Sequence, residues 1–322
     1  MSLDTNLVSK ILVLDTTVEH FEQIKQFCDQ KGLIGLRIQP NNIIRTLNSY
    51  VDLGGIMISE EYAGSFGKTI ELVKLIRQTR PELPIILRRN ADSAGEVLID
   101  TVARLFSSTY IIDDLAPLHK FIENYIFSVT YPNAMIRGIT EISIQSLQSQ
   151  FKSLTVTVSA PYIVKDRIIF GEVFSLIPLE SNWCRGYMML QTEESILDSL
   201  VVSNDGLQYA QTPFRVLNNV LGEVTNLIWG AFKNRFFSPE LERTNRSVIQ
   251  VPLIVNHSNK YISFGSENPQ LCFKYTLLDE TTGLFCSIYQ WFIFNLDFTP
   301  ELFEEIKTTV DDLIDLGELE LF

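Results

Sequence analysis

Glu223 and Asn226 stand three positions apart in the apolar stretch LGEVTNLIWG, residues 221 to 230. At about 100° per residue they would lie one turn apart on the same side of a helix. Both are therefore predicted to face solvent or a partner. The apolar residues around them are expected to form the buried stripe of this helix, namely Leu217, Val220, Leu221, Val224, Leu227, Ile228 and Ala231.

Three further residues are predicted on the outer side of the same helix: Asn219, Gly230 and Lys233. Amphipathic helices commonly have a polar outer side, so a Glu and an Asn at this spacing do not establish a function by themselves. Asparagine is a mediocre helix former, and glycine destabilises a helix relative to alanine. Gly230 would let a partner backbone approach closely. We therefore expect these three residues to contact a partner.

The segment VLGEVTNLIWGAFK resembles the signature helix of the CheC, CheX and FliY family of chemotaxis phosphatases, whose active helix carries Glu-x-x-Asn. The flanking segments are similar too. GYMMLQTEESILDSLV resembles the upstream strand and helix of CheX, and SVIQVPLIVN, with Pro252, resembles the downstream strand. The resemblance spans about residues 133 to 298. CheC proteins carry the motif twice, whereas Glu141 is followed here at the third position by Ile144, so CheX is the more similar relative.

The resemblance implies a protein aspartyl-phosphate phosphatase of chemotaxis signalling that acts in trans on a phosphorylated CheY-type response regulator. Asn226 would orient a water in line with phosphorus, and Glu223 would grip the receiver's lysine. An acyl phosphate is already activated, so it needs an oriented water more than a strong base. No intrinsic cofactor or metal site is expected, because Mg²⁺ would come with the partner receiver. The alternative is a non-catalytic scaffold that docks receivers or joins a switch-like assembly.

The chain that must position this helix divides into two predicted domains, residues 1–129 and 130–322. The first alternates short apolar runs with amphipathic segments, as in a doubly wound parallel α/β sheet. Its predicted strands are KILVLD, GLRIQ, GGIMIS, LPIILR and TYIID, with helices such as HFEQIKQFCDQKG and TIELVKLIRQTRP between them. SVTYPNAM is predicted to be a linker, because Pro132 interrupts both helix and strand patterns.

The second domain is predicted to be α+β, with packed helices on a largely antiparallel sheet. After a helix near residues 133 to 151, β-branched and aromatic runs favour antiparallel strands: SVIQVPLIVN, KYISFG, CFKYTLLDE and LFCSIYQWFIF. From Pro300 onward, acidic residues alternate with Leu and Ile, which predicts a solvated amphipathic helix. Those acidic residues are Glu301, Glu304, Glu305, Asp311, Asp312, Asp315, Glu318 and Glu320.

The first domain resembles the response-regulator receiver, a flavodoxin-like module that is phosphorylated on aspartate. The resemblance covers residues 9 to about 128 and rests on strand order and on the phrases GGIMISEEY and STYIIDDL. The family needs an acidic pair, an Asp, a Thr or Ser, and a Lys at successive strand ends. The matching positions read Asp15 and Thr16, then Glu60, Arg89 and Asp113.

Only Asp15 fits that receiver pattern, and Asp113 places a negative charge where phosphoryl transfer needs a cation. We predict a degenerate receiver that cannot take part in ordinary phosphotransfer. Its possible roles are to dock partners, to mediate dimerisation, or to occupy the phosphatase helix as an inhibitor.

The composition excludes several other classes. A net charge of −13, from 26 basic and 39 acidic residues, disfavours nucleic-acid binding. MSLDTNLVSK carries no apolar signal core and no stretch is apolar enough for a membrane span, so a cytoplasmic protein is expected. Cys28, Cys184, Cys272 and Cys286 are scattered, and we expect buried or semi-buried thiols. Since related CheX domains pair, the resemblance also implies a homodimer.

Overall fold

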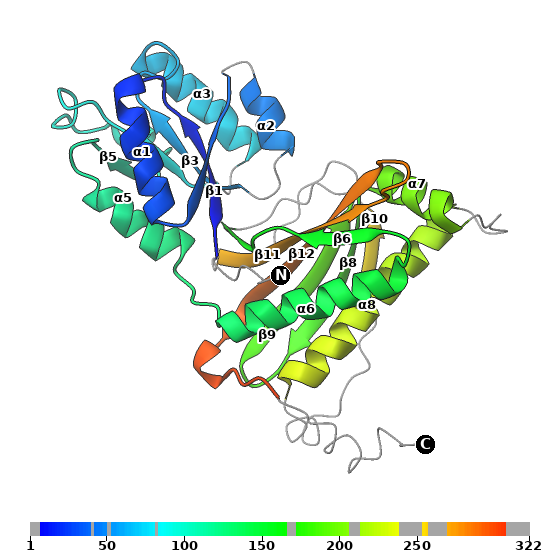
Figure 1. Cartoon of the computed structure of the whole chain (residues 1–322). Coiled ribbons are helices and arrows are strands. Elements are labelled where there is room, and N and C mark those ends of the chain that lie inside the picture. Colours follow the sequence, from blue (N-terminus) through cyan, green and yellow to red (C-terminus); the bar gives the residue numbers. More distant parts are fainter. Residues whose placement is uncertain are drawn as a thin grey trace, which may run out of the picture.

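The protein is represented by a computed structural model that describes residues 7–39, 42–49, 53–80, 83–165, 172–205, 213–237, 253–256 and 269–306. Two sheets organise these residues (Figure 1). We call the five-stranded sheet the N-terminal sheet and the seven-stranded sheet the C-terminal sheet. All strand pairs are parallel in the first and antiparallel in the second. The predicted fold class is therefore confirmed.

The N-terminal sheet has the strand order β2-β1-β3-β4-β5. Its strands are β1 (Ser9–Leu14), β2 (Leu33–Arg37), β3 (Leu53–Ser59), β4 (Ile85–Arg88) and β5 (Ser108–Tyr110). Every residue of β3 and β4 is buried, as expected for strands covered on both faces. β5 ends earlier than predicted, because Ile111 and Asp114 close a turn in which the Asp114 amide donates to the Ile111 carbonyl at 3.2 Å.

Helices cover this sheet: α1 (Val18–Gln30), α2 (Ile43–Ser49), α3 (Phe66–Thr79), the short α4 (Asp100–Ala103), and α5 (Ala116–Phe121), which runs into a π-helical turn, η2 (Ile122–Ile126). α3 begins at Ser65, whose side chain accepts a hydrogen bond from the Lys68 amide at 3.4 Å. Its inward residues follow the helical period that its sequence predicted: Thr69, Ile70, Val73 and Ile76.

The C-terminal sheet has the order β10-β8-β9-β12-β11-β6, and β7 also pairs with β11. Its strands are β6 (Thr155–Val158), β7 (Tyr162–Lys165), β8 (Val173–Glu180), β9 (Cys184–Thr192), β10 (Leu253–Asn256), β11 (Pro269–Leu278) and β12 (Phe285–Phe298). The predicted antiparallel pairing of CFKYTLLDE with LFCSIYQWFIF is confirmed by β11 and β12. KYISFG and most of SVIQVPLIVN lie outside the described residues.

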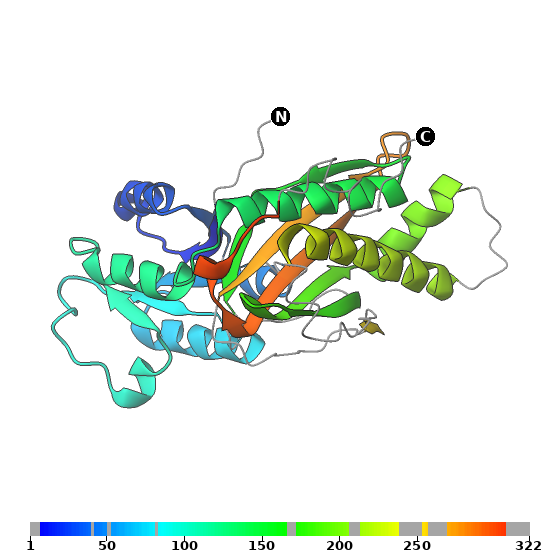
Figure 2. The same cartoon turned by 90° about the horizontal axis from the view of Figure 1, so that it is seen from below.

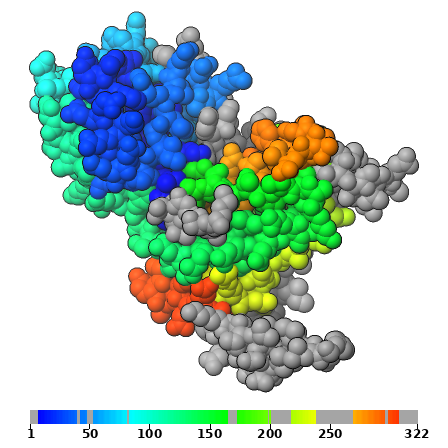
Figure 3. Space-filling view, viewed as in Figure 1, coloured from blue at the N-terminus to red at the C-terminus, as the bar shows by residue number. Residues whose placement is uncertain are grey.

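Two long helices, α6 (Asn133–Gln150) and α8 (Pro213–Phe236), lie side by side on one face of the C-terminal sheet (Figures 1 and 2). α7 (Glu194–Asp205) follows β9, as the sequence predicted. In the space-filling view, α6 in green and part of α8 in yellow form the surface on this side (Figure 3). Within the described ranges, no helix is both long and apolar enough to cross a membrane.

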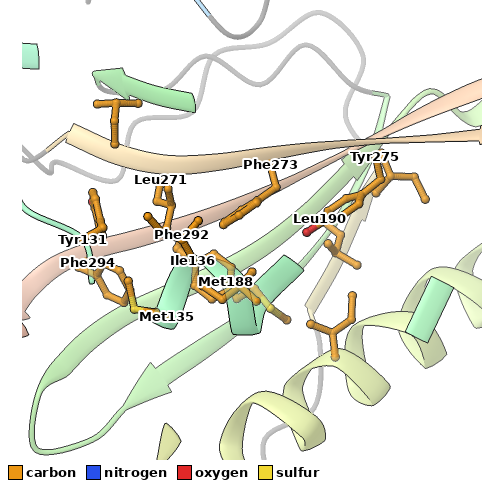
Figure 4. Close-up of a cluster of buried hydrophobic side chains, with 14 of the residues drawn as sticks. Tyr131, Met135, Ile136, Met188, Leu190, Leu271, Phe273, Tyr275, Phe292 and Phe294 are labelled. Carbon is orange, nitrogen blue, oxygen red and sulfur yellow. The ribbon is translucent and has the colours of Figure 1, made fainter. Parts of the chain in front are cut away.

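The core beneath α6 joins helix to sheet. Figure 4 shows Met135 and Ile136 of α6 packed against side chains of β9, β11 and β12, among them Met188, Phe273 and Phe292. All five are at most 1% exposed.

The four cysteines are buried and form no disulfide with one another, which confirms the expected thiols. Burial raises the pKa of Cys28 to about 12 and that of Cys286 to about 11, so both thiols are neutral at pH 7.

The two sheets meet at the amino end of β1. Val8 bridges to Tyr162 of β7, and the Ser9 hydroxyl donates to the Ile163 carbonyl at 2.9 Å. The amino ends of the parallel strands thus face the C-terminal sheet, and their carboxyl ends point away from it (Figure 1). Asp15 lies six residues beyond Ser9, which at roughly 3.3 Å per residue puts the carboxyl ends about 20 Å from the junction.

The acidic segment after β12 is not the predicted helix where it is described. Pro300–Leu302 forms a single 3₁₀ turn, η3, and residues 303–306 have no regular secondary structure. The Phe303 ring packs 5.1 Å from that of Trp183, and the Ile306 amide donates to the Arg235 carbonyl at 2.8 Å. These contacts to the protein body replace helical hydrogen bonds. The remaining acidic positions, from residue 307 onward, lie outside the described residues.

Candidate functional site

The inward side of α8 differs from the predicted stripe at one residue. Leu217, Leu221, Val224 and Ile228 are buried as predicted, and Val220 and Ala231 are half-buried. Leu227 is 42% exposed, so its predicted place in the core was wrong.

Thr225 takes the inward position instead, because its hydroxyl donates to the Leu221 carbonyl at 2.7 Å and shares a hydrogen bond with Ser175 of β8. A residue two positions after an inward one is turned by about 200°, which directs Leu227 outward.

The outward side of α8 carries the predicted polar residues. Glu223, Asn226 and Asn219 are exposed. The Asn226 side chain is exposed, and no described residue forms a hydrogen bond with its side-chain amide. The Gln150 amide, at the end of α6, donates to a Glu223 carboxylate oxygen at 3.5 Å, the long limit for such a bond. Glu223 is thus only weakly held.

Beside this pair, Leu227 and Gly230 share the outward face at helical spacing. No heavy atom lies within 4 Å of where a Cβ on Gly230 would be, so the fold itself does not require glycine there. Lys233, one turn further, is half-buried. The structure therefore groups the predicted outer residues on one face and adds a leucine that the sequence pattern had assigned to the core.

The carboxyl end of α8 is held firmly. The Trp183 indole donates to the Phe236 carbonyl at 3.0 Å, and Arg235 forms ion pairs with Glu141 of α6 at 2.8 Å and with Glu305 at 2.6 Å. Glu141 is the residue at which a second Glu-x-x-Asn motif would begin. It is engaged by Arg235, and Ile144 stands where that motif needs asparagine.

Three of the five residues that stand at the positions of the receiver pattern gather at the carboxyl ends of β1, β3 and β4. Asp15 follows β1 and Glu60 follows β3, and Arg89 forms an ion pair with Glu60 at 2.7 Å. Thr16 and Asp113 are exposed and make none of these contacts. The structure thus brings Asp15, Glu60 and Arg89 to one edge of the sheet and leaves the other two predicted positions outside the cluster.

Sequence reasoning missed three members of this cluster: Arg88, Asn90 and Ser93. Arg88 forms an ion pair with Asp15 at 2.5 Å, and the Ser93 hydroxyl donates to Glu60 at 2.5 Å. One signal was available, since two consecutive arginines end a buried strand in LPIILRRN, next to two strands that each end on an acid. Among the described residues, no group of three or more His, Cys, Asp or Glu side chains is arranged to hold a metal ion.

No protein-family model matches the sequence, and no curated protein matches it. Similar solved structures include the chemotaxis protein CheX from Vibrio vulnificus, at 19% identity over 49% of this chain and 97% of that chain, with a TM-score of 0.36. A CheC-like superfamily protein from Shewanella sp. PV-4 gives 17% identity over 50% and 98%, with a TM-score of 0.36. A response regulator from Thermotoga maritima gives 11% identity over 37% and 97%, with a TM-score of 0.29. Sequence identities and TM-scores this low carry no conclusion about chemistry. The chemistry of this chain must be argued from its own side chains on α8.

Proposed function

We propose that the chain is a protein aspartyl-phosphate phosphatase that acts in trans on a phosphorylated CheY-type receiver. The observation that carries this proposal is the exposed Asn226 amide, available one helical turn from the exposed Glu223 carboxylate on a firmly anchored helix. The resemblance of VLGEVTNLIWGAFK to the signature helix of chemotaxis phosphatases gives that pair its chemical meaning.

In the proposed reaction, Asn226 reaches into the receiver's active site and holds a water in line with phosphorus. The water oxygen bonds to phosphorus while the bond between phosphorus and the aspartyl oxygen breaks, so the receiver recovers a free carboxylate and both protons of the water leave with the phosphate as dihydrogen phosphate. Because the acyl phosphate is activated, an uncharged amide suffices. Glu223 pairs with the receiver's lysine, and Mg²⁺ bound to the receiver neutralises charge on the phosphoryl oxygens.

We further propose that the chain consists of two domains, residues 1–129 and 130–322, and that the substrate is a receiver on a separate protein. The carboxyl ends of the N-terminal sheet lie about 20 Å from the junction of the two sheets, on the side away from the C-terminal sheet. Bringing them onto α8 of the same chain would require breaking the contacts of Val8 and Ser9 with β7. The N-terminal unit therefore suits partner docking or dimerisation better than inhibition of its own α8.

The direct test measures phosphate release from a labelled, phosphorylated chemotaxis receiver with and without this protein. We expect at least roughly tenfold acceleration at saturating protein, because an oriented water removes much of the entropic barrier to hydrolysis. A panel of receivers identifies the cognate one. If some receivers bind the protein stably but none of them releases phosphate faster in its presence, the non-catalytic scaffold is favoured.

Glu223→Ala is expected to weaken the complex with the phosphorylated receiver by roughly three- to tenfold, because an exposed ion pair with the receiver's lysine is lost. Turnover at saturating receiver should change less than affinity. Titration of the receiver gives the dissociation constant, with Glu71→Ala on α3 as the control, since Glu71 is an exposed acid and its loss changes the net charge equally. Equal affinities of Glu223→Ala and wild type would rule out the docking role.

A further inference from the structure

The carboxyl ends of β1 and β3 flank the place where open α/β sheets bind ligands. In the strand order β2-β1-β3-β4-β5, the order in which successive strands are added reverses at β1 and β3, and open α/β sheets commonly bind ligands beyond the carboxyl ends of the strands at such a point. Asp15 and Glu60 stand at these two strand ends, with side chains only 8% and 6% exposed. Two buried carboxylates at this edge of the sheet require compensating positive charge.

Arg88 supplies this charge to Asp15. Its Nε donates to Asp15 Oδ2 at 2.5 Å, and its Nη2 donates to Oδ1 at 3.1 Å and to the Thr17 hydroxyl at 3.0 Å. The Thr17 amide donates to Oδ1 as well, at 2.9 Å. Nη1 donates to the Asn90 side-chain oxygen at 3.2 Å. Both oxygens of Asp15 are therefore engaged by a guanidinium that is 3% exposed.

Arg89 does the same for Glu60. Its Nε donates to Oε2 at 2.7 Å, while Oε1 accepts from the Asn90 amide at 3.0 Å and from the Ser93 hydroxyl at 2.5 Å. Nη2 of Arg89 donates to the Ser93 carbonyl at 2.5 Å, which ties the loop after β4 to the same cluster. The Phe66 ring lies 5.9 Å from the guanidinium carbon.

We infer that Arg88 and Arg89 are built-in cations that replace a divalent metal at these strand ends, so that the N-terminal unit responds neither to Mg²⁺ nor to phosphodonors. Mg²⁺ needs oxygen ligands at about 2.1 Å in octahedral geometry, and all four carboxylate oxygens here already accept hydrogen bonds. The residues present do not fit the metal. Fold stability alone does not explain the pairs, because buried ion pairs are often no better than apolar residues of similar volume.

The consequence is a receiver-like unit fixed in one state. In this cluster Glu60 holds the loop after β4 through the Ser93 hydroxyl and the Asn90 backbone amide. Because the protein's own side chains fix the loop, the surface around it is presented constitutively under this inference. This inference does not depend on the proposed phosphatase activity of α8.

The test begins with the full-length wild-type protein. We expect its thermal unfolding midpoint to be the same in millimolar MgCl₂ and in EDTA at matched ionic strength. We also expect no acid-labile phosphate on the protein after incubation with acetyl phosphate and Mg²⁺. Stabilisation by Mg²⁺, or stable phosphate on the N-terminal unit, would overturn the inference.

The second arm removes the built-in cation beside Asp15. Arg88→Ala should lower the midpoint by roughly 5 to 10 °C, because a buried carboxylate loses its partner. Mg²⁺ should then restore part of the loss. Asp15→Asn combined with Arg88→Met removes both charges and should show no Mg²⁺ effect. If Arg88→Ala folds and Mg²⁺ does not raise its midpoint, Arg88 does not stand in for a metal. If it fails to fold, the wild-type measurements decide.

Discussion

Asn226→Ala should reduce dephosphorylation of a phosphorylated receiver by about a hundredfold or more, since the variant can no longer orient the attacking water. The protein should stay folded, because the Asn226 side chain is exposed and no described residue forms a hydrogen bond with it. Single-turnover release of labelled phosphate at saturating protein measures the chemical step, and circular dichroism with thermal unfolding measures the fold. The loss should appear in turnover and not in receiver affinity.

Two matched variants separate chemistry from general damage to the helix. Asn234→Ala removes another exposed amide of α8, two turns further along, and should leave turnover unchanged. Asn226→Asp keeps the size of the side chain but adds a negative charge next to the phosphoryl group, so it should also be slow. If Asn226→Ala dephosphorylates the receiver as fast as wild type, Asn226 is not catalytic and the non-catalytic scaffold is favoured.

Much of the fold could be predicted from sequence because its signals are local. β3 and β4 read as continuous apolar runs since both faces of a parallel strand are covered, and α3 reads as a helix since its apolar residues recur at the helical period. Where prediction failed, distant partners decided. The segment after Pro300 packs Phe303 on Trp183, a residue more than a hundred positions away, and this contact replaces the helix that its own pattern favoured.

The candidate site shows the same division. The outward direction of Glu223 and Asn226 followed from periodicity. The rotation of α8 about its own axis was predicted less accurately. A hydrogen bond between the Thr225 and Ser175 hydroxyls fixes which residues face the sheet, and Leu227 therefore faces outward. Partners fifty residues apart leave no local pattern in the sequence.

The N-terminal cluster could be predicted only in part, because it depends on charges from three strand ends. Asp15 and Glu60 were visible as acids at strand ends. Their pairing with Arg88 and Arg89 depends on the order of the strands in space, since β4 lies beside β3 and not beside β1. Several charged residues at the predicted carboxyl ends of buried parallel strands are the pattern that would have indicated this pairing.

Gly186 of β9 shows how backbone contact in the C-terminal sheet supports the site on α8. A Cβ at this position would lie 1.8 Å from the Ile293 carbonyl oxygen of β12. The oxygen belongs to the backbone and the Cβ is fixed to its own backbone, so no side-chain rotation could separate them. The pairing of β9 with β12 is irregular here, between Ile293 and Asp297. Glycine within a strand commonly marks such an irregularity or a close backbone approach.

The irregular stretch of β12 carries Phe294, whose ring lies 6.0 Å from that of Trp183, and Trp183 holds the end of α8 by its bond to the Phe236 carbonyl. Gly186→Ala must separate β9 from β12, so the base on which α8 ends should be disturbed. We expect a loss of about 3 kcal/mol in the free energy of unfolding, measured by urea denaturation, together with slower phosphate release from the phosphorylated receiver at temperatures where wild type is active.

Gly230→Ala is the matched control, because it is expected to change the free energy of unfolding in the opposite direction. An added Cβ there meets no atom within 4 Å, and alanine is favoured over glycine inside a helix by roughly 1 kcal/mol. Gly230→Ala should therefore be more stable than wild type, and any loss of receiver affinity in it would come from the crowded outer face of α8. If Gly186→Ala unfolds at the same urea concentration as wild type, β9 and β12 tolerate a wider spacing than the close approach at Ile293 implies.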